Sequence, residues 1–201
     1  MLQLGVAYSY RNPDGDLRYR ALPESHVTDV RFVDTGTFVA DTIGLLNLQG
    51  AFVYGPFSLQ GEYILSDVDT KFFGDREFDS YYVQASYFLT SEHRPWDTGD
   101  SGFGRLNPRR NFRLGGEDPG WGAWEVGIRY SAIDLSDGPI RGGEEDNITL
   151  GLNWYLNPHS RMLINYTHAN IDRDFFGGNT YFPLSKGGDV DILQTRFQVD
   201  F

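Results

Sequence analysis

The final segment of the chain, residues 193–201, alternates strictly between apolar and polar side chains. The odd positions are Leu193, Thr195, Phe197, Val199 and Phe201. The even positions are Gln194, Arg196, Gln198 and Asp200. A period of two places successive side chains on opposite faces of a strand, and a helix would not sort these residues into two classes. The pattern therefore predicts a β-strand with one apolar and one polar face.

The same alternation recurs along most of the sequence. It is clear over residues 2–10, 57–65, 80–89, 124–131, 147–156 and 161–167. It is weaker over 43–54, where Leu45 and Leu46 are adjacent. We therefore predict an all-β, antiparallel fold of about eight strands of about ten residues, which is the length that spans a bilayer when the strand is tilted.

The connections between these strands are of two kinds. Tight turns are predicted at Tyr54–Phe57 and Asn157–His159. Long polar loops are predicted over 11–41, 67–77, 134–144 and 172–190. Short turns at one end and long loops at the other are typical of an outer-membrane β-barrel.

The polar faces carry mixed Gln, Ser, Asn, Thr, Glu and Arg side chains. Such a mixture suits a wet lumen better than a packed core, where each polar group would need a partner. Aromatic residues near strand ends, such as Tyr54, Phe57 and Trp154, suit the two membrane interfaces. The alternative is a non-transporting β-barrel or a soluble β-sandwich with an interaction or structural role, because sandwich strands also alternate.

One long segment, residues 90–120, does not fit the turn pattern. Counting strands back from the C-terminus places both of its ends on the periplasmic side, where turns should be short. It carries five arginines: Arg94, Arg105, Arg109, Arg110 and Arg113. We expect it to fold into the lumen. The alternative is that residues 90–120 form a periplasmic loop in which the arginines pair with carboxylates of the same loop.

Composition and motifs disfavour several other functions. Cysteine is absent and the net charge is −11, so we expect neither disulfides nor nucleic-acid binding. The four histidines, His26, His93, His159 and His168, have no metal-ligand spacing, and the acidic clusters lack the glycine-centred spacing of a calcium loop. We predict no catalytic residues, no enzyme activity, no metal and no cofactor.

The start of the sequence reads directly into a strand and shows no basic region followed by a cleavage site. An exported protein needs such a signal, so either the protein is cytosolic or this sequence lacks its natural N-terminus. We expect the second: residues 1–201 would be the C-terminal half of a barrel whose N-terminal strands and signal peptide are missing. Taken alone, eight strands would close only a side-chain-filled barrel, so we predict an open or distorted half-barrel.

Several stretches of the chain resemble one known family. They are YGPFSLQGEY from Tyr54, SYYVQASYFLTSEHRPW from Ser80, GAWEVGIRYSAIDLSD from Gly122 and GGEEDNITLGLNWYLNPHSRMLINYTH from Gly142. Together they are similar to the phosphate-selective porin O and P family. The resemblance implies a sixteen-stranded, usually trimeric barrel of the outer membrane, surrounded by lipid and lipopolysaccharide, that passes small anions such as phosphate.

The resemblance also implies a ladder of arginines along the pore. The candidates for pore-lining residues in this sequence are Arg18, Arg20, Arg129, Arg196, Glu62 and Glu125. Arg18 and Arg20 alternate, so they would point the same way from a loop folded inward. The family's lysine clusters have no counterpart, since Lys71 and Lys186 are the only lysines.

Overall fold

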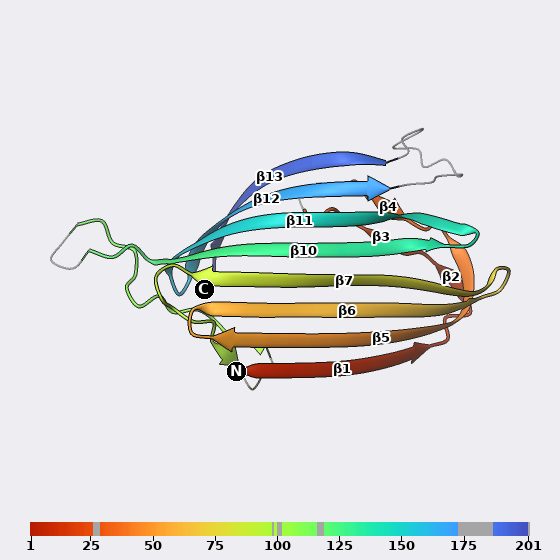
Figure 1. Ribbon diagram of the computed structural model, residues 1–201, viewed down its shortest axis with the longest axis horizontal. Helices are drawn as coiled ribbons and strands as arrows, with labels where there is room; N and C mark the ends of the chain where they lie inside the picture. Colours follow the sequence, from red (N-terminus) through yellow and green to blue (C-terminus); the bar gives the residue numbers. More distant parts are fainter. Residues whose placement is uncertain (26–28, 98, 100–101, 116–118, 173–186, 201) are drawn as a thin grey trace.

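The computed structural model describes residues 1–201 except 26–28, 98, 100–101, 116–118, 173–186 and 201. It is built from β-strands (Figure 1). The eight long strands are β1 (Leu2–Arg11), β5 (Phe38–Tyr54), β6 (Phe57–Thr70), β7 (Gly74–Phe88), β10 (Ala123–Asp137), β11 (Ile140–Asn157), β12 (Ser160–Asp172) and β13 (Gly187–Val199). The short strands are β2 (Gly15–Leu17), β3 (Arg20–Ala21), β4 (Val33–Asp34), β8 (Trp96–Asp97) and β9 (Gly102–Phe103).

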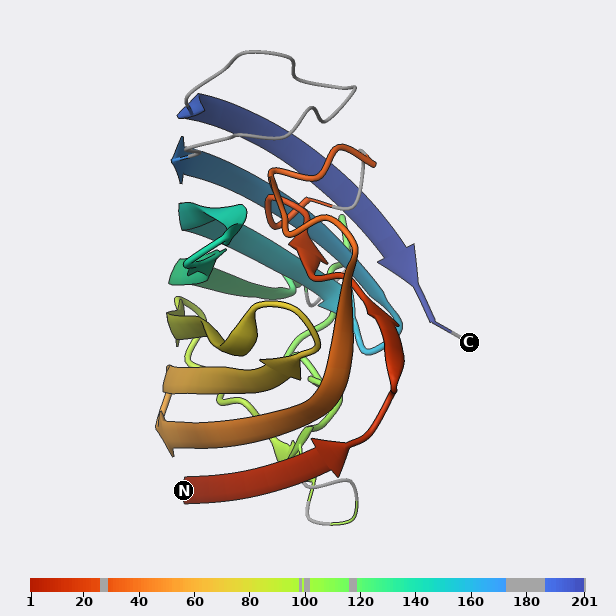
Figure 2. The same ribbon diagram turned by 90° about the vertical axis from the view of Figure 1, so that its right-hand side faces the viewer.

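The long strands form one antiparallel sheet in the order β1-β5-β6-β7-β10-β11-β12-β13, and β2 pairs with β5 at the side. The sheet curves into an arc whose edges, β1 and β13, lie apart (Figure 2). This confirms the predicted all-β, antiparallel fold class, and the sheet is open, as predicted. No helix among the described residues is long and apolar enough to cross a membrane.

Two tight turns share the dipeptide Gly-Pro. Gly55 and Gly138 both have positive φ, 54° and 56°, at the first position of a two-residue turn. Glycine adopts this conformation without steric cost, and the following proline suits the next position of such a turn. The turn at Tyr54–Phe57 was predicted from the sequence. The equivalent turn at Gly138–Pro139 was not, although it has the same signal.

The predicted long loops 67–77 and 134–144 are wrong. β6 continues to Thr70 and β7 starts at Gly74, while β10 and β11 are separated only by Gly138 and Pro139. The predicted loop 11–41 contains β2, β3, β4 and the start of β5. In the predicted loop 172–190, residues 187–190 already belong to β13. Lys186 and the rest of that loop, 173–186, lie outside the described residues.

The strands extend farther than predicted because the two faces exchange polarity at the loop end. There the outward positions are acidic, as at Asp67, while the inward positions are apolar and buried. The buried cluster comprises Val33, Phe38, Ala40, Ile43, Val68, Phe78, Leu135 and Ile140. Val33 belongs to the segment between β1 and β5, residues 12–25 and 29–37, which we call the strap. The cluster therefore holds the strap against the inner face of the sheet.

Candidate functional site: the concave face

The convex outer face of the sheet is apolar and exposed along the strands. Leu4 on β1 and Leu193 on β13 are 76% and 74% exposed, and Val83, Ile128 and Leu150 are exposed on strands between them. Near the turn end the Trp124 and Trp154 rings stack, with ring centroids 4.9 Å apart. An exposed apolar surface that extends across a whole sheet is suited to lipid rather than to water.

The concave face is polar. One row of side chains crosses five neighbouring strands in register: Gln60, Gln84, Arg129, Thr149 and Thr167. Each of these residues lies on the polar face of its own strand. The register between strands brings residues that are more than 100 positions apart in the sequence into one line. We call this row and its neighbours Glu62, Tyr82, Ser131 and Asn147 the polar belt.

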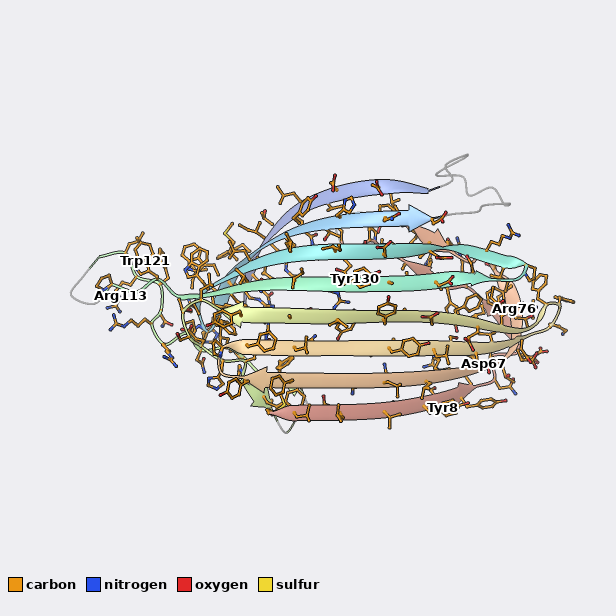
Figure 3. The ribbon with its side chains drawn as sticks, in the orientation of Figure 1. Tyr8, Asp67, Arg76, Arg113, Trp121 and Tyr130 are labelled. Atoms are coloured by element: carbon orange, nitrogen blue, oxygen red, sulfur yellow. The ribbon has the colours of Figure 1, made fainter. Side chains whose placement is uncertain are left out.

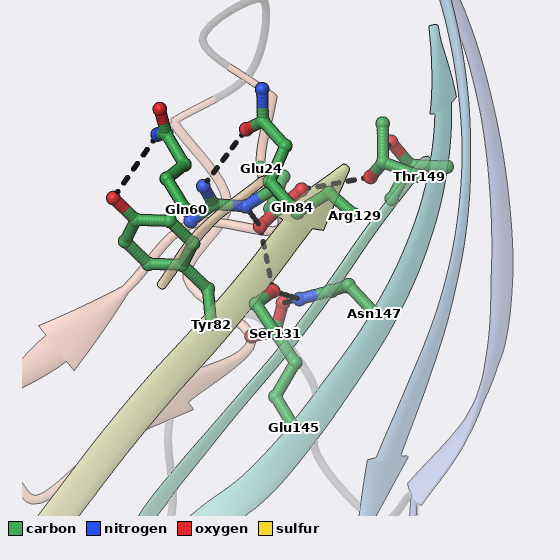
Figure 4. Close-up of polar contacts among 10 residues, drawn as sticks. Glu24, Gln60, Tyr82, Gln84, Arg129, Ser131, Glu145, Asn147 and Thr149 are labelled. Atoms are coloured by element: carbon green, nitrogen blue, oxygen red, sulfur yellow. Dashed lines mark hydrogen bonds and ion pairs between the residues drawn. The ribbon is translucent and has the colours of Figure 1, made fainter. Parts of the chain in front are cut away.

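The strap crosses this belt through Glu24 (Figure 4). Arg129 Nε donates to Glu24 Oε1 at 2.5 Å, and the Ser131 hydroxyl donates to the same oxygen at 2.6 Å. The Thr149 hydroxyl donates to Glu24 Oε2 at 2.8 Å. The next residue, Ser25, donates to Gln194 on β13 at 3.3 Å. The strap therefore bridges strands β10, β11 and β13.

Aromatic and amide groups fix the guanidinium of Arg129 on its other side. Its Cζ lies 3.7 Å from the centre of the Tyr82 ring, and its Nη1 donates to Gln84 Oε1 at 3.5 Å. Gln60 Nε2 in turn donates to the Tyr82 hydroxyl at 3.3 Å. Stacking on an aromatic ring leaves the edge of a guanidinium available for hydrogen bonds, here to Glu24.

A second charged cluster lies near the turn end of the same face. Glu125 is fully buried and accepts three hydrogen bonds. The donors are Arg94 Nη2 at 2.5 Å, Asn153 Nδ2 at 3.0 Å and the Tyr155 hydroxyl at 2.9 Å. Because Arg94 comes from the segment between β7 and β10, this ion pair fastens that segment to the inner face.

The segment between β7 and β10 follows two different courses. Its first part packs inside, through Arg94 and through Leu106 against Phe88, Ala123 and Tyr155. Arg105 lies at the rim, where its Nη1 is 3.0 Å from His159 Nδ1.

The later part of this segment lies elsewhere, beyond the ends of the long strands (Figure 3). Arg113 and Trp121 mark it in the figure. The side chains of Arg109, Arg110 and Arg113 are exposed, and the Arg109 backbone N–H donates to the buried Glu92. We expected all of 90–120 to fold into the lumen, but only its first part packs on the inner face. Farther along, the Phe112 N–H donates to the Leu156 carbonyl at the turn end, and Arg113 pairs with Gly120.

The remaining candidate pore residues are spread over the concave face. Arg18 pairs with Asp34 inside the strap at 2.5 Å, and Arg20 is exposed in β3. Arg196 is exposed on β13 opposite Leu163, and Glu62 on β6 accepts from Asn47 Nδ2 at 2.5 Å. Three of the arginines, Arg18, Arg94 and Arg129, each contact a carboxylate. Of the arginine candidates for the pore lining, Arg18 and Arg129 thus form ion pairs, while Arg20 and Arg196 are exposed.

The Arg18–Asp34 pair affects the protonation of its carboxyl group. Burial of Asp34 by itself would raise its pKa, but the hydrogen bonds from Arg18 and the Gly36 N–H, with the charges of Arg18 and Arg20, lower the pKa below the ordinary value. The carboxylate is therefore ionised whenever the strap is docked near neutral pH.

Sequence reasoning did not single out Glu24, Asp34 or Tyr82. Glu24 and Asp34 lie in a segment without periodicity, so no pattern assigned their direction. Tyr82 lies opposite Ser131 in the strand register, so only the side-chain packing shows that the Arg129 guanidinium stacks on its ring. Among the described residues no group of three metal-ligating side chains comes together; His26 lies outside them.

Comparison with known proteins gives consistent matches. The sequence profile described as "Phosphate-selective porin O and P" matches residues 1–201. A protein of Pseudomonas aeruginosa named Porin O is 30% identical over 183 residues, covering 84% of this chain and 38% of its own length. An uncharacterized protein of Caulobacter vibrioides is 28% identical over 207 residues, covering all of this chain and 39% of its own length. The chain thus spans about two fifths of each of these relatives.

Proposed function

This chain belongs to the phosphate-selective porin O and P family, and on that premise we propose that it forms part of a passive diffusion channel in the outer membrane of a Gram-negative bacterium. Family membership points to a channel rather than an enzyme. The channel takes small solutes, with a preference for anions such as phosphate. The remaining strands of the barrel come from sequence outside these 201 residues, so that the chain supplies the C-terminal half.

The observation that carries this proposal is the opposite character of the two faces of one curved sheet. The convex face is apolar and exposed from β1 to β13, while the concave face is polar and holds two inward-folded segments. A curved sheet with lipid outside and water inside suits a pore wall. Outer-membrane phospholipid and lipopolysaccharide would surround the convex face, and three copies would assemble as the homotrimer that the family resemblance implies.

The preference for anions rests on arginines whose charge faces the lumen. Among the candidates, Arg20 and Arg196 are exposed, and neither forms an ion pair within the described part of the chain, although the charge of Arg20 acts on the nearby Asp34. Charged rings in a narrow pore set ion selectivity. These two arginines are therefore the first to test.

The test is conductance of the full-length protein in planar bilayers, with reversal potential in a salt gradient and titration of phosphate as a blocker. We expect anion-selective steps that phosphate blocks. Arg20→Gln and Arg196→Gln should each lower the anion-to-cation permeability ratio by a factor of about two to ten. Arg141→Gln, at an exposed position near the β10–β11 turn, is the control. Stable insertion without selectivity would retain the pore and remove the phosphate preference. Absence of conductance would favour a non-transporting barrel.

A further inference from the structure

Glu24 occupies a position on the inner face that is built to hold an oxyanion. We propose that Glu24 is a specificity-determining residue: its carboxylate fills this position from within the chain and keeps solute oxyanions away from Arg129. The proposal rests on the proposed function, since it assigns a role in solute selection to one residue of the pore wall.

Three donors from two neighbouring strands converge on the Glu24 carboxylate. They are Arg129 Nε at 2.5 Å, the Ser131 hydroxyl at 2.6 Å and the Thr149 hydroxyl at 2.8 Å. A guanidinium with two hydroxyl groups is the donor set that also binds phosphate and other oxyanions, through short charge-assisted hydrogen bonds. The donors lie on rigid strands, whereas the acceptor is carried by the strap.

The backbone at Glu24 is strained. Its φ is +38°, in the left-handed region that residues other than glycine rarely adopt. Such a conformation costs free energy and persists only where surrounding contacts enforce it. The hydrogen bonds from the three donors to the Glu24 carboxylate therefore coincide with a strained backbone conformation at the same residue.

The strap is anchored to the sheet by contacts that do not involve Glu24. Val33 lies in the apolar cluster at the loop end, and Phe32 packs with Ala169 and Ile171 on β12. Ser25 reaches Gln194 on β13. Removing the Glu24 charge should therefore leave the Arg129 guanidinium without its counter-charge while the strap stays docked.

The position is accessible to a small solute. The Arg129 and Glu24 side chains are 30% and 18% exposed, and both line a hollow of about 230 Å³ together with Glu62, Tyr82 and Asn147. In the native chain the ion pair is neutral, so Arg129 adds little to the attraction of anions. Without the Glu24 charge, the same guanidinium would face the hollow unpaired.

Four variants of the full-length protein test this in planar bilayers, with inorganic phosphate as the blocker. Glu24→Gln should shift the reversal potential toward the anion and lower the half-blocking phosphate concentration by about tenfold, the effect of one charge-assisted hydrogen bond. Glu24→Asp keeps the charge and should behave as wild type. The double variant Glu24→Gln/Arg129→Gln removes both members of the ion pair and, like wild type, leaves the pair with no net charge, so it should return close to wild type in both measurements.

Asp16→Asn is the matched control, because it removes one negative charge from an exposed position of the same strap. If it changes selectivity as much as Glu24→Gln, the effect is one of net charge and the proposal is wrong. An unchanged reversal potential and block in Glu24→Gln would also overturn it. Heat-dependent gel migration of each variant shows whether the barrel has folded.

Calorimetric titration of inorganic phosphate into the detergent-solubilised full-length protein separates this inference from the proposed function. Glu24→Gln should bind phosphate about tenfold more tightly than the double variant, because only the former retains Arg129. If wild type fails to conduct but this difference is found, the channel proposal fails and the Glu24 site stands. If wild type conducts and the difference is absent, the channel stands and the Glu24 site does not.

Discussion

Buried charges on the concave face are held by specific partners at the level of single residues. Glu125 has no exposed surface, and its carboxylate depends on Arg94, Asn153 and Tyr155. Placing a carboxylate out of water is costly unless its acceptor positions are filled. Loss of either charged partner should therefore affect stability more than loss of an exposed charge.

Glu125→Ala leaves the Arg94 guanidinium, which is only 20% exposed, without its counter-charge. We expect destabilisation by about 3–5 kcal/mol, the range for breaking a buried ion pair, and release of the segment that carries Arg94. The measurement is the midpoint temperature of the heat-dependent gel shift in the full-length protein. Glu144→Ala, an exposed residue on neighbouring β11, is the control, and an equal shift in both variants would contradict the prediction.

The strap is the element that shapes the concave face. Its apolar side chains pack against the inner surface of the sheet at the loop end, while Glu24 reaches the polar belt and Ser25 reaches Gln194 on β13. The Arg18–Asp34 ion pair links two parts of the strap to each other, and Asp34 is almost fully buried. Its docking should therefore depend on the ionisation of Asp34.

The lowered pKa of Asp34 makes strap docking sensitive to acid. A carboxyl whose pKa is lower in the folded state contributes stability above its ordinary value, near pH 4, and loses that contribution as pH falls through the lowered value. We expect hydrogen-exchange protection of residues 17–22 and 32–36 to be constant above about pH 4 and to fall below it.

Asp34→Asn has no carboxyl to titrate, so strap protection in that variant should be lower throughout and independent of pH over the same range. Loss of wild-type protection already above about pH 5 would show that another group controls docking.

At the scale of the whole molecule, the sheet is an open arc with two unpaired edges. β1 pairs only with β5 and β13 only with β12 among the described residues. An exposed strand edge readily pairs with another strand. In the full-length barrel we therefore expect both edges to pair with strands from outside this chain.

Paired cysteines test this arrangement, since the chain has no native cysteine. Val6→Cys with Thr195→Cys places one cysteine on each edge strand, and this pair should form no disulfide in the full-length protein. Ile164→Cys with Thr195→Cys occupies directly opposed positions of β12 and β13 and should cross-link, because opposed positions have a suitable Cβ separation. Cross-linking of the first pair under oxidation, resolved on a denaturing gel, would show that these strands close on themselves.

The sequence by itself determined the eight long strands and their two faces, because hydrophobic alternation is a local property with a fixed period of two. Glu125 and Arg129 were assigned to polar faces for this reason. The sequence did not reveal that β6, β7, β10 and β11 extend beyond the part of the sheet with an apolar outer face. In these extensions the apolar side chains lie on the inner face and pack on the strap.

The tertiary structure alone decided which charges meet. Glu24 contacts Arg129 and Arg94 contacts Glu125 across separations of 105 and 31 residues. Neither pairing has a periodic signal, because one partner of each lies in a segment without regular alternation. Strand register and the path of the strap determine these contacts, and both depend on packing between segments that are distant in the sequence.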